Sequence, residues 1–103
     1  MGMLEIGGIV LRHEPSADGA TAEIAGHLHP AAKLLRNGYA LRRRCFVSNR
    51  ARVVMPAFGA FTGGLNVLDV AFAPLFPASE EPTVLMLCDE GIYPVPVRHL
   101  APD

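Results

Sequence analysis

The sequence predicts a small domain made mostly of β strands and hairpins, with one short helix. Three observations favour this fold class. Apolar runs of strand length recur along the chain, and turn-forming residues, among them 10 glycines and 9 prolines, separate these runs. Asn37-Gly38, the strongest two-residue hairpin signal, lies between two of the runs. The length of 103 residues allows one domain at most.

Each expected strand is an apolar run bounded by turn residues. The expected strands are residues 4–12, 21–25, 31–36 (strand or helical turn), 39–47, 52–57, 83–87 and 92–97. Gly7-Gly8 inside the first run indicates a bulge or a close backbone approach, and Pro56 interrupts the fifth. Pro94 and Pro96 place the last strand at a sheet edge, after a hairpin around residues 89–91. Joined in this order, the strands form a meander.

Two segments differ from this pattern. Residues 58–66 form a glycine-rich loop that has neither the Walker nor the dinucleotide-binding glycine spacing. Residues 67–76 are apolar, with Asp69 near their start, and suit the short helix or a buried irregular segment. The glycine-rich segment therefore does not indicate a nucleotide site.

The sharpest chemical signal is a Gly-His-x-His-Pro run at residues 26–30, where the strand 21–25 ends. Side chains alternate along an extended segment, so His27 and His29 are expected to point the same way and Leu28 the other. Pro30 removes an amide donor just where the strand would otherwise continue. Neutral imidazole is a common ligand of zinc, manganese and iron. His27 and His29 are therefore candidate metal ligands.

Two imidazoles do not complete a metal centre. Zinc takes three or four protein ligands, and a two-metal phosphoesterase centre takes more, mostly carboxylates. The other ligands of His27 and His29 would come from elsewhere in the chain or from another chain. The alternative is that both histidines are exposed loop residues without a ligand.

The composition is unusually apolar. Half of the residues are hydrophobic and 18% are charged, against about a quarter in an average soluble domain. A chain of this length buries only part of its surface, so the surplus suggests a face for a partner domain or a second subunit. A well-packed small β domain is the alternative.

The net charge of −1 conceals an uneven distribution of charged residues. No Asp or Glu occurs from Ile24 to Leu68, and seven of the nine basic residues fall in that stretch. A basic block beside a histidine pair favours an anionic substrate, phosphate above all, with Arg42 and Arg44 as candidate phosphate contacts. Alternatively, residues 42–44 form a solvated strand face that discourages aggregation.

Cys45 and Cys88 lie far apart in apolar runs without Cys-x-x-Cys spacing, and they are expected to be structural. The first residues lack the basic start and apolar core of a signal peptide, and no apolar run reaches membrane-spanning length. We therefore expect a soluble, cytoplasmic protein with no membrane contact.

Four segments, taken in order, carry a family resemblance. They are residues 26–30 (GHLHP), 45–47 (CFV), 56–67 (PAFGAFTGGLNV) and 93–95 (YPV). Together they resemble the C-terminal part of the bacterial ligase-associated DNA damage response endonuclease, a calcineurin-like metallophosphoesterase. The resemblance runs from about Leu4 onward, and the long glycine-rich block is its most specific part.

The resemblance implies the C-terminal portion of an α/β metallophosphoesterase sandwich, with residues 1–103 as a single partial domain. His27 and His29 would each ligate a metal, typically manganese, and two such ions would activate water for phosphodiester hydrolysis linked to DNA repair. The family's Asp-x-His, Gly-Asp-x-x-Asp and Gly-Asn-His-Asp/Glu motifs, which supply its other ligands and its catalytic histidine, are absent from this sequence. We therefore expect a fragment that is inactive alone and pairs with a missing N-terminal half or another subunit, with DNA as a possible partner.

A function of another class stays open. A non-catalytic small β module could bind a partner chain or nucleic acid through its basic stretch and its surplus apolar surface. A cupin-like barrel fits poorly, since Lys33 and Leu34 occupy the place of the glutamate that follows the cupin histidine pair.

Overall fold

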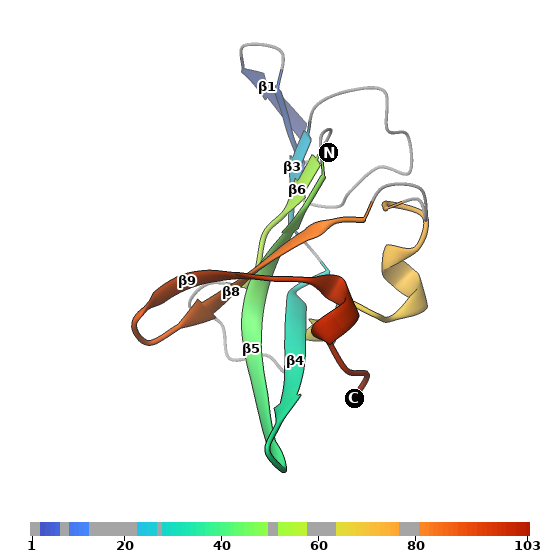
Figure 1. Cartoon of the computed structure of the whole chain (residues 1–103). Coiled ribbons are helices and arrows are strands. Elements are labelled where there is room, and N and C mark those ends of the chain that lie inside the picture. Colours follow the sequence, from blue (N-terminus) through green and yellow to red (C-terminus); the bar gives the residue numbers. More distant parts are fainter. Residues whose placement is uncertain are drawn as a thin grey trace.

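The computed structural model of the protein describes residues 3–6, 9–12, 23–26, 28–49, 52–57, 64–76 and 81–103. These residues form nine strands and two short 3-10 helices (Figure 1). The strands are β1 (Met3–Ile6), β2 (Ile9–Arg12), β3 (Glu23–Ala25), β4 (Pro30–Arg36), β5 (Tyr39–Ser48), β6 (Arg52–Val54), β7 (Leu65–Asn66), β8 (Thr83–Cys88) and β9 (Gly91–Val95). The helices are η1 (Val70–Phe72) and η2 (Val97–His99). A mostly β fold is confirmed, but this part of the chain has two helical turns instead of the one predicted.

Strand β5 connects the whole sheet. Its first part, residues 39–44, pairs with β4, and its last part, residues 45–48, pairs with β8. Val47 and Ser48 also pair with β6, from which β3, β2 and β1 continue the sheet. Figure 1 shows the β4–β5 hairpin and the β8–β9 hairpin extending from this junction in different directions. Ten residues of one strand thus join two hairpins and the N-terminal strands.

The sheet is mixed, so the predicted meander is wrong. β2 pairs with β3 in parallel, β3 pairs with β6 in parallel, and β7 is parallel to β4. The single strand predicted for residues 4–12 is also wrong, because β1 and β2 pair antiparallel with Ile6 opposite Ile9. A Gly-Gly pair between two apolar runs suits a two-residue hairpin connection as well as a bulge. The glycine-rich loop prediction lies mostly outside the described residues, apart from Gly64 and β7.

Both predicted hairpins are confirmed. Asn37 and Gly38 have φ values of +51° and +81°, which match a turn with two left-handed residues and join β4 to β5. Gly91, with φ +146°, follows the turn between β8 and β9. Within the described residues β9 pairs with β8 alone, so Pro94 lies on an edge strand as predicted.

The core lies on one face of the sheet. Register places Cys45 opposite Met86 and Val47 opposite Val84, so these four side chains share a face, and all are buried. The segment around η1 covers them with three further buried residues, Phe72, Leu75 and Phe76. Asp69 begins η1 because its carboxylate accepts a hydrogen bond from the Ala71 amide at 2.9 Å. The segment 67–76 is thus a short helix followed by buried irregular chain, as the sequence indicated.

The burial of the two free cysteines predicts different reactivities. Burial raises the pKa of Cys45 to about 12, so its thiol stays protonated at neutral pH, whereas Cys88 is half-buried at the end of β8. Because the thiolate is the nucleophile, we expect one thiol of the native protein to react quickly with a disulfide reagent, and both to react after denaturation. Cys88→Ser should remove the fast reaction. Fast labelling that survives this substitution would contradict the burial of Cys45.

Candidate functional site

The histidine run connects β3 to β4. β3 ends at Ala25, the amide of Leu28 donates to the carbonyl of Gly26 at 2.9 Å, and β4 begins at Pro30. A bond between residues two apart marks a tight turn, and His29 has a left-handed backbone with φ +51°. The prediction of an extended backbone that points His27 and His29 the same way is therefore wrong at His29. Pro30 begins a strand instead of ending one, because the first strand position tolerates a missing amide donor. His27 lies outside the described residues.

The end of the glycine-rich segment packs directly against His29. The carbonyl oxygen of His29 accepts a hydrogen bond from the Leu65 amide at 2.8 Å, and β7 continues beside β4. Gly64 has φ +72°, and a Cβ atom there would lie 2.9 Å from the His29 oxygen. A left-handed backbone costs about 1–2 kcal/mol at a residue with a side chain, so neighbouring contacts hold His29 in this conformation. The half-buried imidazole is thus attached to a backbone that β7 fixes.

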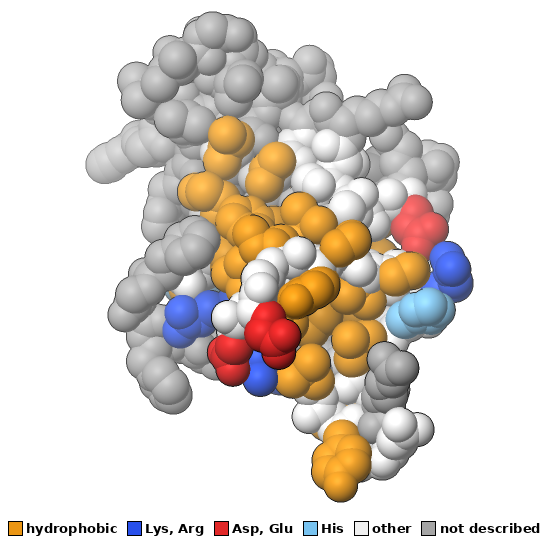
Figure 2. Space-filling model, turned by 60° about the vertical axis from the view of Figure 1, so that its left-hand side comes forward, with side chains coloured by type: hydrophobic (Ala, Val, Ile, Leu, Met, Phe, Trp, Pro, Cys, Tyr) orange, Lys and Arg blue, Asp and Glu red, His pale blue; other side chains and the backbone are white. Residues whose placement is uncertain are grey.

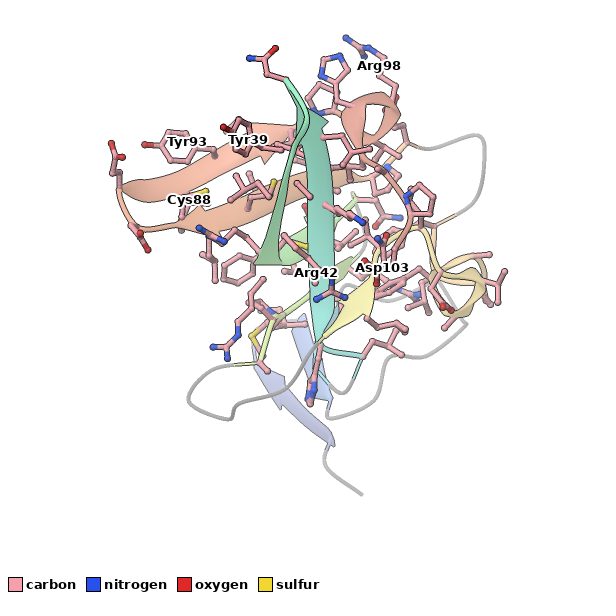
Figure 3. All side chains as sticks on the ribbon, turned by 90° about the horizontal axis from the view of Figure 1, so that it is seen from below. Tyr39, Arg42, Cys88, Tyr93, Arg98 and Asp103 are labelled. Carbon is pink, nitrogen blue, oxygen red and sulfur yellow. The ribbon has the colours of Figure 1, made fainter. Side chains whose placement is uncertain are left out.

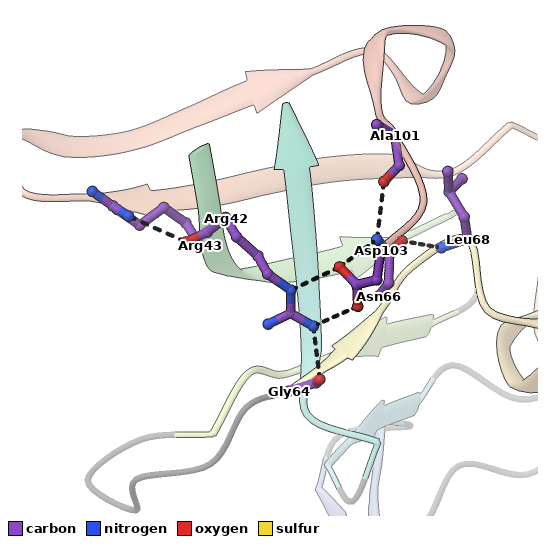
Figure 4. Close-up of polar contacts among 7 residues, drawn as sticks. All are labelled: Arg42, Arg43, Gly64, Asn66, Leu68, Ala101 and Asp103. Carbon is purple, nitrogen blue, oxygen red and sulfur yellow. Dashed lines mark hydrogen bonds and ion pairs between the residues drawn. The ribbon is translucent and has the colours of Figure 1, made fainter. Parts of the chain in front are cut away.

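A polar network on the other side of Gly64 was not predicted from the sequence (Figures 3 and 4). The Arg42 guanidinium donates to both carboxylate oxygens of Asp103, each at 3.0 Å, and to the carbonyl of Gly64 at 2.9 Å. The buried Asn66 amide donates to the Ala101 carbonyl at 2.9 Å and to Asp103 at 3.3 Å, and its oxygen accepts from the Leu68 amide at 2.8 Å. These contacts tie the C-terminal residues to the segment that packs on His29.

The C-terminal segment is also held by backbone bonds. The Ala101 amide donates to the Lys33 carbonyl at 2.8 Å, and Leu100 forms a bridge with Leu34 on β4. No sequence motif marks Asp103 as a partner of Arg42, since the two residues are 61 positions apart. The many basic residues and the lack of Asp and Glu in residues 24–68 indicated only that these arginines need anionic partners from elsewhere.

Among the described side chains, the basic block does not form one exposed surface. Arg52 is 2% exposed and donates to the Leu75 carbonyl at 3.5 Å, so it belongs to the interior. Arg43 donates to the Arg42 carbonyl at 3.1 Å, while Arg44 is half-buried on β5 opposite Ala31. Arg42 is engaged by Asp103, as described above. Contact of Arg42 and Arg44 with a substrate phosphate stays a prediction.

The carboxylate of Asp103 makes the network sensitive to acid. Its hydrogen bond with Arg42, followed by that with Asn66, lowers the pKa of Asp103 below the ordinary range. A carboxylate with a lowered folded-state pKa stabilises the fold above its unfolded-state pKa, and this contribution is lost as the pH falls through the folded-state value. The loss therefore begins near pH 4 and grows toward lower pH.

We expect Asp103→Asn to remove this acid-dependent part of the stability while keeping a side chain of the same size. Urea unfolding at several pH values between about 2 and 7 measures it. The wild-type and variant curves should approach one another at the acid end. A constant difference over the whole range would show that the carboxylate charge contributes nothing.

The candidate metal ligands do not form a complete donor set among the described residues. A neutral imidazole nitrogen at His29 suits a divalent transition metal. Within the described part of the chain, however, no three residues among His, Cys, Asp and Glu lie close enough together to hold an ion. The sequence also has no carboxylate between Ile24 and Leu68. His27 and His29 therefore do not suffice for a two-metal centre.

Comparison with known proteins finds a solved nuclease structure that is similar to this chain. No protein-family model matches the sequence, and no curated relative was found. Among solved structures, the chain is similar to the crystal structure of the Pseudomonas putida nuclease MPE, with 30% sequence identity and a TM-score of 0.63. The match covers 89% of this chain and 40% of the nuclease, so the chain spans about two-fifths of the nuclease's length. The predicted likeness to a nuclease is confirmed at this level. In the described residues no helix has the length and hydrophobicity to cross a membrane.

Proposed function

We propose that this chain is the C-terminal segment of a metal-dependent phosphodiesterase of the calcineurin-like class, an endonuclease that acts in DNA repair in the cytoplasm. The observation that carries the proposal is the likeness to a nuclease over 89% of the chain at 30% identity. The Gly-His-x-His run supports it, because it supplies two nitrogen donors at a connection between strands, where binding sites commonly lie.

His27 and His29 are proposed to provide nitrogen ligands to the metals, with manganese as the preferred ion. When bound, a two-metal centre activates a water molecule and neutralises the phosphate charge during in-line displacement. Gly64 and Leu65 act on His29 through its backbone, since one packs against its carbonyl oxygen and the other donates to it. These two residues fix the position of the His29 backbone, from which the imidazole side chain extends. The carboxylate ligands are proposed to come from outside the residues described here.

Manganese binding by the chain alone tests the site. We expect weak Mn²⁺ binding, measured by electron paramagnetic resonance, because affinity follows the number and charge of the ligands. His29→Ala should reduce this binding. His99→Ala is the matched control, because His99 is exposed on η2 and lies outside the histidine run. Equal binding by the wild type and His29→Ala would contradict the assignment of His29 as a ligand.

Turnover provides a second test. With Mn²⁺ and a phosphodiester substrate, the chain alone should show only background hydrolysis, because its two imidazoles leave most of the metal-ligand positions unfilled. Robust turnover that depends on His29 would show that this chain completes the centre by itself and would overturn the incomplete-site proposal.

A non-catalytic role in nucleic-acid binding is the second candidate, and the observation that favours it is the stretch from Ile24 to Leu68, which holds seven of the nine basic residues and no Asp or Glu. Binding of DNA measured at several salt concentrations separates the two functions, because a face that contacts phosphates gives a steep loss of affinity with salt in the absence of any metal. Salt-dependent binding without Mn²⁺, combined with no effect of His29→Ala, would favour the binding module.

A further inference from the structure

A cavity of about 280 Å³ lies between the sheet and the segment around η1. Val47 of β5 and Val84 of β8 line it from the sheet, and Phe72 and Phe76 line it from the covering segment. All four side chains are buried, so residues of the folded core shape the cavity. Because core side chains are closely packed, this shape is largely fixed before any ligand binds.

One charged group borders this apolar space. Among the described residues that line the cavity, Asp69 is the only charged one, and all the others are apolar. The Asp69 carboxylate accepts a hydrogen bond from the Ala71 amide at 2.9 Å, which holds it at the start of η1. Asp69 is exposed, so it lies where the cavity opens to solvent. A carboxylate has two acceptor oxygens, so capping η1 leaves it able to bind a ligand as well.

Shape and charge distinguish the cavity from the rest of the apolar surface. Figure 2 shows apolar side chains gathered in a broad area on one face of the molecule. An open apolar area of this kind does not specify the chemistry of a ligand. Small-molecule sites are concave and mostly apolar, with a few polar groups that orient the ligand, and the cavity has each of these features.

The volume and the charge together define a class of ligand. An enclosed apolar cavity of about 150 Å³ holds a benzene molecule, so the larger space beside η1 accommodates one aromatic ring with a short chain. A positive group at the end of that chain would be attracted to the Asp69 carboxylate, whereas a negative group would be repelled by it.

We propose that the cavity binds a small organic cation, in which an apolar group about the size of one aromatic ring carries an ammonium group on a short chain. The ring would lie against Val47, Val84 and Phe72, and the ammonium would pair with Asp69 at the opening. The site goes beyond the proposed function, because none of its residues is a candidate metal ligand or a candidate phosphate contact.

The ligand would also affect the segment that packs against His29. Val67 lines the cavity, follows β7 directly, and donates from its amide to the Ala31 carbonyl at 2.9 Å. A ligand that binds only the folded state stabilises that state. We therefore expect hydrogen exchange at the Val67 amide to slow when the cavity is filled.

Three ring compounds that differ in charge test the proposal: phenethylammonium, phenethyl alcohol and phenylacetate. Binding is followed through the NMR signals of the valine methyl groups, which include those of Val47 and Val84 in the cavity. We expect phenethylammonium to shift these signals and to bind about two- to fivefold more tightly than the alcohol, which is the range for an exposed ion pair. Phenylacetate should bind most weakly. Absence of a shift at Val47 and Val84 with phenethylammonium would overturn the site.

Asp69→Asn tests the charge. The asparagine oxygen can still accept from the Ala71 amide, so η1 keeps its cap. We expect this variant to bind phenethylammonium and phenethyl alcohol equally well. A preference for the ammonium that survives the substitution would overturn the pairing with Asp69, and so would equal binding of the two compounds by the wild type.

Ala73→Phe tests the cavity itself. Ala73 lines the cavity and is exposed, so the new ring would occupy the space that the ligand needs while the core stays intact. We expect all three compounds to bind about tenfold more weakly. Ala71→Phe is the matched control, because Ala71 is exposed on η1 and does not line the cavity. Both variants should keep the wild-type circular dichroism spectrum. Binding that is unchanged in Ala73→Phe, or equally weakened in both variants, would place the compounds outside the cavity and overturn the proposal.

Discussion

Gly64→Ala should destabilise the protein by about 2–5 kcal/mol. The new Cβ atom would lie 2.9 Å from the His29 carbonyl oxygen and 3.1 Å from the Cβ of Ala31. Ala31 is fixed by the pairing of β4 with β7, and the His29 carbonyl is held by the Leu65 amide, so the backbone of β7 must move. The left-handed φ of +72° adds about 1–2 kcal/mol for a residue with a side chain, and forced contacts of this kind cost about 1–3 kcal/mol. Urea unfolding followed by circular dichroism measures the loss.

Gly38→Ala is the matched control for the backbone conformation. Gly38 has φ +81°, but no atom lies within 4 Å of the position that its Cβ would take. We expect a loss of about 1–2 kcal/mol there, from the left-handed conformation alone. Equal losses for the two variants would show that Gly64 does not approach His29 as closely as described. Gly64→Ala should also weaken Mn²⁺ binding if His29 is a ligand, whereas Gly38→Ala should leave it unchanged.

Asn66→Ala should cost about 2–4 kcal/mol. The substitution leaves the Leu68 amide and the Ala101 carbonyl without their side-chain partner, and an unsatisfied buried polar group costs about 1–3 kcal/mol. Since Ala101 and Asp103 both contact Asn66, the C-terminal segment should loosen as well. Hydrogen exchange at the Ala101 amide, which is bonded to Lys33, reports this loosening directly.

Asn66→Asp separates the two halves of this interaction. An aspartate keeps an oxygen for the Leu68 amide but loses the donor to Ala101, and it places a second carboxylate near Asp103. We expect this variant to be less stable at neutral pH than near pH 4, where protonation relieves the repulsion. A stability that does not change with pH would contradict the proximity of Asn66 and Asp103.

Much of the secondary structure was predictable because its signals are local. Asn37-Gly38 specifies a turn through its own backbone preferences, and β5 and β8 each contain an apolar run of strand length next to turn residues. The parallel pairings of β2, β3 and β6 were not predictable, because strand neighbours far apart in sequence depend on the whole sheet. The Gly7-Gly8 run was ambiguous for a different reason: a bulge and a hairpin turn both favour glycine.

The candidate site was predictable in part. The histidine motif predicted that the run lies where a strand ends, and His29 does lie in a connection between two strands. The left-handed backbone conformation of His29 was not predictable, because it depends on contacts with β7, which lies more than 30 residues later. The Arg42–Asp103 pair could not be predicted, since an arginine in a basic run gives no signal of its partner. The roles of His27 and His29 as ligands, and of Arg42 and Arg44 as phosphate contacts, stay predictions. Both cysteines lie in strands, as expected for structural residues.

The proline on β9 has a consequence for how copies of this protein meet one another. Pro94 offers no amide hydrogen on a strand that pairs on one side only within the described residues. A neighbouring molecule that tried to extend the sheet by adding a strand there would lack a donor in the middle of the ladder. Growth into fibres by strand addition along β9 is therefore disfavoured at high concentration.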